Sequence, residues 1–144
     1  MTKEYNEAFF KLFQDLYLTL KKNHGEKRAL SDFSEVMITG LRQAYGADKR
    51  GVSTEEFAMI VGKRDQTVGL EVSFKDVLSD SLIYQFHTDP FPGLKGEIAS
   101  EQLDHTYMNF KVQYLLGEDW SYETTQHLWK GDKCTQHIIR KKIK

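Results

Sequence analysis

The residues with the clearest chemical potential lie near the C-terminal end of the sequence. Cys134 is the only cysteine of the chain, and His127 precedes it in the stretch "HLWKGDKC". A cysteine beside a histidine is the smallest pair that supplies a thiolate nucleophile and its base. The dipeptide Gly131-Asp132 is typical of a two-residue hairpin turn, which would place Trp129 opposite Cys134. In that register the Cβ atoms of His127 and Cys134 lie about 7–8 Å apart.

Both faces of this predicted hairpin mix polar and apolar side chains. The register pairs His127 with Gln136 and Glu123 with Arg140, so Glu123 is better placed to meet the arginine than to orient the imidazole. A hairpin that covers a core normally alternates apolar and polar residues. A mixed pattern fits an edge strand, in which Cys134 is a small buried hydrophobe. It also fits a strand beside a partly hydrated cavity, where Cys134 and His127 would meet a ligand.

A second set of polar side chains occurs in "FHTDPFPG", where His87 and Asp89 lie two positions apart. His105, further along the chain, is a possible third ligand for a metal ion. Zinc requires three or four protein ligands in a compatible geometry, and an aspartate before a proline is typical of a turn. We therefore interpret His87 and Asp89 as a strand end and a turn, and we predict no metal site. No nucleotide-binding, zinc-protease or serine-hydrolase motif is present, so the cofactor, if there is one, stays unknown.

Composition limits the class of protein. A chain of 144 residues with 40% hydrophobic and 28% charged residues is typical of one globular domain, residues 1–144. The formal net charge of −1 favours neither nucleic acid nor an anionic membrane as a partner. One cysteine makes no internal disulfide, which fits a reducing compartment, and the longest apolar runs are too short to cross a membrane. We expect a cytoplasmic protein with no nucleic-acid or membrane partner.

Hydrophobic spacing predicts three helices in the N-terminal half. Apolar residues recur at helical intervals from Phe9 onward, and Gly25 is a plausible end of that first helix. The second helix is expected to begin at Ser31 or Asp32 and to end at Gly46. Ser53 begins the third helix, because a glutamate three positions later completes a capping box.

The hydrophobic period changes from helical to alternating at residue 69. Alternation over 70–75 and 82–87 predicts two strands. A fourth helix begins at Ser100 and ends near Gly117, and strands of about 120–130 and 134–142 follow. The predicted fold is α+β: three N-terminal helices, then β-β-α-β-β, with a four-stranded antiparallel sheet and helices on one face.

The segment 69–140 resembles the 4-vinyl reductase-like domains and the family of L-2-amino-thiazoline-4-carboxylic acid hydrolases. The stretches that carry the resemblance are "LEVSFKDVLSDSLIYQFHTDPFPG", "YLLGEDW", "SYETTQHLWKGDKC" and "TQHIIRK". The positions that match the family pattern are Glu123, Gly131, Asp132 and Cys134. The resemblance implies a domain that binds small hydrophobic molecules, or a small hydrolase, and related folds occur in vesicle-tethering subunits that pair through their helices. Further cysteines of the family pattern are missing here.

Three functional hypotheses follow. The first is a small-molecule-binding or sensing domain with its pocket between sheet and helices. The residues expected to line that pocket, with Cys134 beside them, are Tyr84, Phe86, His105, Tyr107, Phe110 and Trp129. The second is a hydrolase of a cyclic amide-like substrate, with Cys134 as nucleophile and His127 as base. The third is a protein-interaction module.

The third hypothesis depends on the first helix. Phe9, Phe10, Phe13 and Tyr17 spread over a broad arc of this helix, more than one neighbouring element would cover. Such a face commonly closes an interface between two copies of a chain. We therefore expect a homodimer, with a small-molecule ligand as its other partner.

Overall fold

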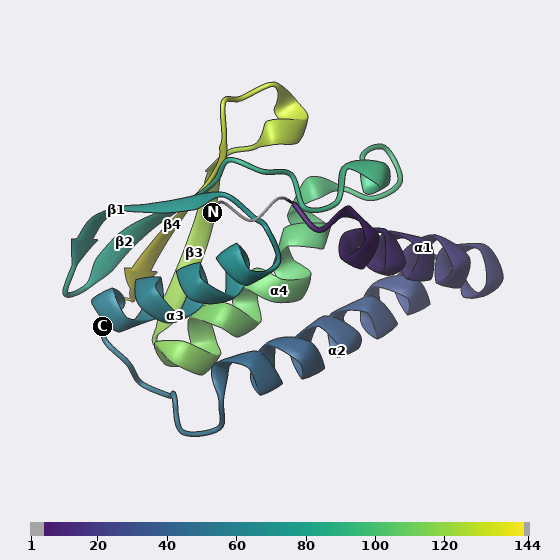
Figure 1. The fold of residues 1–144 in the computed structure, drawn as a ribbon. Helices are drawn as coiled ribbons and strands as arrows, with labels where there is room; N and C mark the ends of the chain where they lie inside the picture. Colours follow the sequence, from purple (N-terminus) through teal and green to yellow (C-terminus); the bar gives the residue numbers. More distant parts are fainter. Residues whose placement is uncertain (1–4, 143–144) are drawn as a thin grey trace.

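The computed structural model describes residues 5–142 and confirms the predicted α+β class and order of elements (Figure 1). Two short 3₁₀ turns, η1 and η2, interrupt the connections. The elements are α1 (Glu7–His24), α2 (Glu26–Tyr45), α3 (Thr54–Thr67), β1 (Val72–Leu78), β2 (Ser81–Phe86), η1 (Pro92–Leu94), α4 (Ser100–Leu115), β3 (Trp120–Gln126), η2 (Leu128–Lys130) and β4 (Thr135–Lys141). Within the described residues, no helix is both long and apolar enough to cross a membrane.

The N-terminal helices end and begin largely where local sequence signals predict. Gly25 ends α1, and Gly46 ends α2. The Ser53 side chain accepts a hydrogen bond from the Glu56 backbone N–H at 3.1 Å, which confirms it as the N-cap of α3. The predicted start of α2 at Ser31 or Asp32 is wrong, because the helix begins at Glu26, directly after Gly25.

A single glycine therefore connects α1 to α2. Gly25 adopts a φ of 89°, which L-residues rarely adopt, and this turns the chain between two helices without a loop. Asp32 does not cap α2. Its carboxylate lies 3.0 Å from the Arg28 Nε one helical turn earlier, as an exposed pair within the helix.

The four strands form one antiparallel sheet in the order β1-β2-β4-β3. Helices α3 and α4 lie against one face of this sheet, α2 packs against α4, and α1 packs against α2 (Figure 1). The helix-facing side of the sheet is rich in aromatic residues, and Tyr84 and Phe86 on β2 are almost completely buried. The helical layers and this face of the sheet enclose the hydrophobic core.

The predicted register of the last hairpin is wrong by two residues. Tyr122 lies opposite Ile139 and Glu123 opposite Ile138, and an irregularity follows before Gln126. The predicted two-residue turn is also wrong, because residues 128–130 form the 3₁₀ turn η2, which ends at Gly131 in the left-handed conformation. A shift of two residues keeps each side chain on the same face of the sheet. Tyr122 faces the helices, and its ring packs against His105 of α4.

Side chains of the connection between β3 and β4 explain this difference. The Asp132 carboxylate accepts a hydrogen bond from the His127 backbone N–H at 2.8 Å, and the His127 ring accepts one from the Trp129 backbone N–H at 3.0 Å. These local bonds satisfy backbone groups that a longer strand ladder would otherwise use. The hairpin consequently ends earlier than its alternating sequence suggests.

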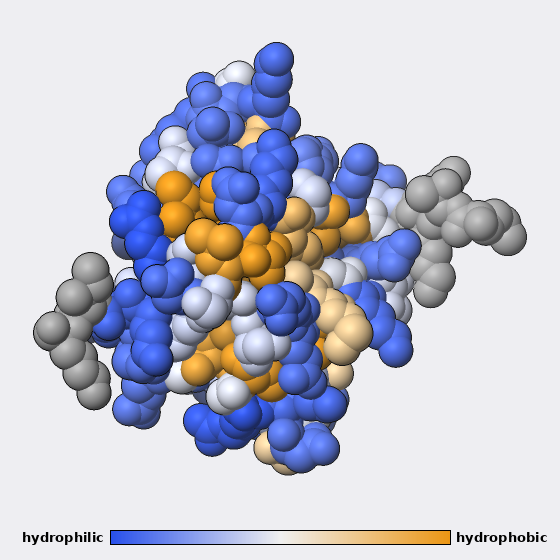
Figure 2. All heavy atoms as spheres, turned by 90° about the vertical axis from the view of Figure 1, so that its left-hand side faces the viewer, coloured by the Kyte–Doolittle hydropathy of each residue, from blue (hydrophilic) through white to orange (hydrophobic). Residues whose placement is uncertain are grey.

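Hydrophobic side chains also reach the surface. Figure 2 shows hydrophobic residues among hydrophilic ones on the side of the molecule at the left of Figure 1. Among the exposed large hydrophobic residues are Met59 on α3 and Leu78 on β1, with 64% and 57% of their surface accessible. Isolated exposed apolar residues are common in folded proteins, so these two indicate no interface by themselves.

Candidate functional site

A cavity of about 60 Å³ lies where α1, α2, α3, α4 and the turn after β2 meet. Aromatic and other apolar side chains make up most of its wall, among them Phe9, Phe10, Phe13, Met37, Phe86 and Phe91. Arg64 and Asp65 near the end of α3 and Lys111 of α4 supply charge to the same wall. The Arg64 guanidinium lies 5.8 Å from the centroid of the Phe9 ring. The cavity thus combines a mainly apolar surface with a few charged groups, which is the usual composition of a small-molecule site.

The charged position is a closed group of three side chains, Asp65, Tyr84 and Lys111, which we call the Lys111 cluster. The Lys111 Nζ lies 3.6 Å from the Asp65 Oδ1 and donates a hydrogen bond to the Tyr84 hydroxyl at 3.1 Å. The Tyr84 hydroxyl donates a short hydrogen bond to the Asp65 Oδ2. Only 4% of the Lys111 side chain and 4% of the Asp65 side chain are exposed, so the ion pair is shielded from solvent.

Aromatic rings surround the Lys111 ammonium group. The Nζ lies 5.1–5.3 Å from the ring centroids of Tyr84, Phe86 and Tyr107. Such rings attract a cation through their quadrupoles. They also replace water with apolar surface, which disfavours the charge.

Burial moves the pKa values of the two charged groups toward each other. Desolvation lowers the pKa of Lys111, and the neighbouring Asp65 carboxylate opposes that shift. Desolvation raises the pKa of Asp65, and the Lys111 ammonium group and the Tyr84 hydrogen bond oppose it. Transferring a proton from the ammonium group to the carboxylate therefore costs less here than in water.

The sequence contains a signal for this cluster that our sequence analysis missed. Asp65 lies four positions after Val61, in phase with the apolar side of α3, and Lys111 lies four positions after Tyr107 on α4. A charged residue in phase with a buried stripe is expected inside the protein only if a partner neutralises it. Our sequence analysis considered only apolar residues on these faces and gave neither charged residue a role.

A second buried polar group lies on the same face of α4, and its charged residue is seven positions, or about two turns, before Lys111. It consists of Asp104, Tyr107 and His127, and we call it the His127 cluster. The Tyr107 hydroxyl donates to the Asp104 Oδ1 at 3.0 Å, and the His127 Nε2 lies 3.2 Å from the Asp104 Oδ2. Because the His127 Nδ1 accepts the Trp129 backbone N–H, the ring proton of a neutral imidazole is on Nε2. The Asp104 Oδ2 is buried, and within the described residues it accepts no hydrogen bond of good geometry.

The His127 cluster has little free space around it. The adjoining cavity measures about 10 Å³, which is close to the minimum for one water molecule. The Trp129 indole closes this side, and its Nε1–H donates to the Asp89 Oδ2 at 2.7 Å. Asp89 also accepts the Phe91 backbone N–H at 3.0 Å, as expected for a turn before a proline.

The proposed nucleophile and base have other partners in this structure. Cys134 is buried, and its thiol lies 3.5 Å from the Gln126 side-chain oxygen. The His127 Nδ1 accepts the Trp129 backbone N–H, and its Nε2 lies 3.2 Å from the Asp104 Oδ2. The geometry therefore gives the catalytic interpretation of Cys134 no support.

The structure separates the predicted ligand-binding residues. Tyr84, Phe86 and Tyr107 come together around Lys111, whereas Trp129 belongs to the wall of the His127 cluster. His105 and Phe110 line a different, open groove between α2 and α4.

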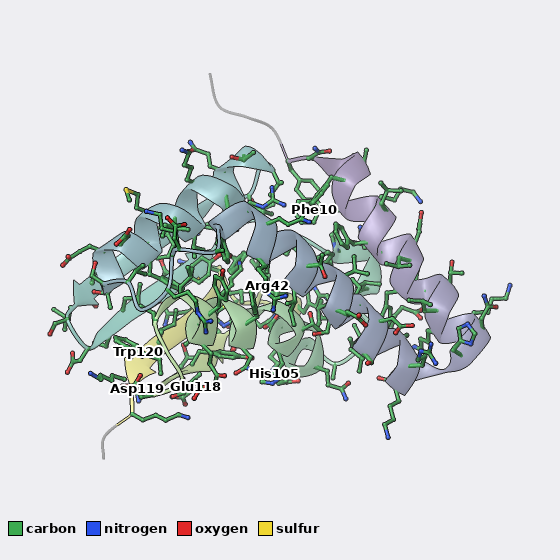
Figure 3. The ribbon with its side chains drawn as sticks, turned by 90° about the horizontal axis from the view of Figure 1, so that it is seen from below. Phe10, Arg42, His105, Glu118, Asp119 and Trp120 are labelled. Atoms are coloured by element: carbon green, nitrogen blue, oxygen red, sulfur yellow. The ribbon has the colours of Figure 1, made fainter. Side chains whose placement is uncertain are left out.

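Arg42 of α2 and His105 of α4 both line this groove and are labelled in Figure 3. The Arg42 guanidinium lies 5.5 Å from the Phe110 ring centroid, and the His105 Nδ1 lies 3.1 Å from the Tyr122 hydroxyl of β3. His87 is exposed, and its Nε2 lies 2.7 Å from the Ser73 hydroxyl oxygen. Over residues 5–142, no group of three or more histidine, cysteine, aspartate or glutamate side chains is arranged to hold a metal ion.

Comparison with known proteins does not assign this chain to a family. The chain matches no protein-family model and no curated protein sequence. The resemblance of residues 69–140 to the 4-vinyl reductase-like domains therefore stays a prediction.

A third buried polar group is a single side chain of the sheet itself. His137 on β4 is completely buried, and its Nδ1 lies 2.9 Å from the Thr124 hydroxyl oxygen. Within the described part of the chain its Nε2 has no hydrogen-bond partner. Burial is the main reason that the pKa of His137 is lowered to about 4, so the ring is neutral at physiological pH.

Proposed function

We propose that this protein binds a small, mainly apolar molecule in the cavity above the Lys111 cluster. The observation that carries the proposal is a cavity with aromatic walls whose polar end is a buried ion pair. The apolar part of the ligand packs against Phe10, Phe13 and Phe91. Its single polar group meets Lys111 or Asp65, and these two residues fix its orientation.

The energetic cost of a buried ion pair supports this proposal. Removing two charges from water costs several kcal/mol per ion, and a well-packed apolar pair of similar volume is often at least as stable. Stability alone therefore does not explain why Asp65 and Lys111 border the cavity. Recognition of a polar group on an otherwise apolar ligand gives them a role that apolar residues would not supply.

The cavity is smaller than the engineered cavity of about 150 Å³ that binds benzene, so a ligand with one aromatic ring also has to occupy the mouth of the cavity. Phe9, Phe13 and Met37 are only half-buried at this mouth, and Gly40 of α2 is exposed beside them. An added side chain at Gly40 would meet no other atom within 4 Å of its Cβ. A substitution at Gly40 can therefore narrow the mouth without disturbing the core.

The test compares two single variants of α2. A panel of small molecules with one polar group each, such as benzyl alcohol, 4-methylphenol and hexanoic acid, is added to the wild-type protein and to Gly40→Leu. The control is Thr39→Leu, since Thr39 is the neighbouring exposed residue and does not line the cavity. Binding is measured by ligand-observed nuclear magnetic resonance and by the melting temperature.

We expect at least one compound to bind the wild-type protein and Thr39→Leu, and to bind Gly40→Leu much more weakly. A ligand present at a hundred times its Kd stabilises the folded state by about 2.7 kcal/mol, which is easily measured as a rise in melting temperature. Equal binding by all three proteins, or no binding by any of them, would contradict the proposal.

A homodimer through α1 is the second candidate, and one observation favours it. Leu12 exposes 72% of its surface on the outer side of α1, beside the half-buried Phe9 and Phe13. An exposed leucine next to aromatic rings fits a contact with a second copy of the chain. Light scattering of the wild-type protein and of Leu12→Glu tests this, and a wild-type monomer at high concentration would exclude the dimer.

A further inference from the structure

We infer that Lys111 is an imine-forming amine, and that the ligand of the cavity is an aldehyde or ketone whose carbonyl carbon bonds to the Lys111 Nζ. This inference rests on the proposed function, because the same cavity has to admit the carbonyl compound. It goes further by naming the class of ligand and the atom that reacts with it.

The geometry around Lys111 is the first argument. Its side chain is 4% exposed, yet the residue lines the cavity, so a ligand reaches the amine from an apolar space rather than from water. The Tyr84 hydroxyl at 3.1 Å and the Asp65 carboxylate at 3.6 Å are the groups that can move its protons. A lysine in an apolar pocket is one of the recognised forms of an activated amine nucleophile.

The protonation state is the second argument. An ordinary lysine has a pKa of about 10.4, so only about one side chain in 2,500 is neutral at pH 7. Burial lowers the pKa of Lys111 and increases that fraction, and the positive charge of Arg64 acts in the same direction. The carboxylates of Asp65 and Asp104 act in the opposite direction and favour the ammonium form.

The reaction can proceed with groups that the cavity already holds. The ammonium group gives one proton to the Asp65 carboxylate, and the Nζ lone pair then forms a bond to the carbonyl carbon. The carbonyl oxygen receives a second proton from nitrogen through the Tyr84 hydroxyl, which yields a carbinolamine. Asp65 returns its proton to the new hydroxyl group, the C–O bond breaks, and water leaves.

The product is a protonated imine beside a carboxylate counter-ion. The total charge of Lys111 and Asp65 is the same before and after the reaction, one molecule of water is released, and no oxidant or reductant takes part. Asp65 therefore has two roles: it carries a proton during the reaction, and it balances the charge of the product.

The experiment uses benzaldehyde as the probe and sodium cyanoborohydride to trap any imine as a stable secondary amine at pH 7. Peptide mass mapping then measures the labelling rate of each lysine. Lys11 and Lys130 serve as internal references, since 66% and 62% of their side chains are exposed. We expect Lys111 to be labelled faster than either, since a lowered pKa increases the fraction of neutral amine at pH 7.

Variants separate this inference from the proposed function. Gly40→Leu should reduce labelling of Lys111 and leave Lys11 and Lys130 unchanged. Lys111→Arg keeps a positive charge for Asp65, but it offers no amine that forms an imine, so the fast label should disappear. Circular dichroism checks whether this variant folds. The comparison of Lys111 with Lys11 and Lys130 in the wild-type protein does not depend on the variant.

Two results would overturn the inference. If benzaldehyde binds in the cavity by nuclear magnetic resonance but Lys111 is labelled no faster than Lys11, the imine is excluded and the proposed binding function survives. If neither benzaldehyde nor any compound of the panel binds, the inference and the proposed function are both excluded.

Discussion

The Lys111 cluster and the His127 cluster use similar side chains on the same face of α4, but their surroundings differ. Each joins a charged residue of α4 to an aromatic hydroxyl and to a titratable group from another element. The Lys111 cluster borders a cavity of about 60 Å³, whereas the space beside the His127 cluster is about 10 Å³. Only the first has room for a ligand.

The elements that close each cluster explain this difference. The η2 turn places Trp129 against Asp89 and seals the His127 cluster with a hydrogen bond. No comparable group covers the Lys111 cluster, where the partly exposed side chains of Phe9, Phe13 and Met37 form the mouth of the cavity. A buried charge in a closed region can contact only other groups of the fold, whereas a buried charge beside free space can also contact a ligand.

The largest expected effect comes from removing the positive charge of the Lys111 cluster. Lys111→Met leaves the Asp65 carboxylate buried without its partner, and we expect a loss of about 3–5 kcal/mol in the free energy of unfolding. Urea denaturation measures this loss. The double variant Lys111→Met/Asp65→Asn removes both charges and should be clearly more stable than the single variant. If the double variant is no more stable, the ion pair does not dominate the energetics of this cluster.

The next effect is a dependence of stability on pH through His137. Its pKa is about 4 in the folded protein and about 6.5 when unfolded. Between these two pH values the unfolded state therefore binds more protons than the folded state. The contribution of neutral His137 to the free energy of unfolding is complete above pH 6.5 and is lost as the pH decreases to 4. A shift of this size corresponds to about 3 kcal/mol.

Denaturation at a series of pH values tests this prediction on the wild-type protein and on His137→Gln. Between pH 6.5 and 4, the free energy of unfolding of the variant should decrease much less than that of the wild-type protein. The exposed His87 provides the matched control, and His87→Gln should follow the wild-type curve. A wild-type curve that is flat in this range would show that protonated His137 is accommodated in the fold.

A smaller effect is expected in the closed cluster. Asp104→Asn keeps the size of the side chain but removes the charge that accepts the Tyr107 hydroxyl hydrogen bond at 3.0 Å, and we expect a loss of about 2 kcal/mol, typical of a hydrogen bond to a charged group. Glu101→Gln is the control on the same helix, because its pair with Lys130 is exposed and should contribute less than about 1 kcal/mol. Equal losses in both variants would argue against a structural role for the buried pair.

The smallest effect tests the free space at the mouth of the cavity. Gly40→Ala adds a methyl group that meets no atom within 4 Å, and we expect a gain of about 0.5–1 kcal/mol from helix propensity. Gly62→Ala on α3 is the comparison, since its Cβ would lie 3.2 Å from the Phe74 ring. A smaller gain at Gly62 than at Gly40, measured by urea denaturation, would confirm that only the mouth has unoccupied space.

Local signals in the sequence were sufficient to predict the order of elements and several of their ends. The Ser53 cap, the glycines that end α1 and α2, and the alternation in β1 and β2 act over a few residues, so they can be recognised without knowing the fold. The start of α2 was missed because the chain turns at Gly25 alone and needs no further capping residue.

The tertiary structure decided which side chains meet. The Asp65–Lys111 pair and the Asp104–His127 contact join elements that are far apart in the chain, and no local pattern specifies such partners. The register of β3 and β4 also depended on bonds inside their connection, where Asp132 and His127 compete with the strand ladder. The sequence by itself determined the helices and strands, because backbone preferences are local. Tertiary packing determined the candidate site, because a buried charge is stable only where the fold brings it a partner.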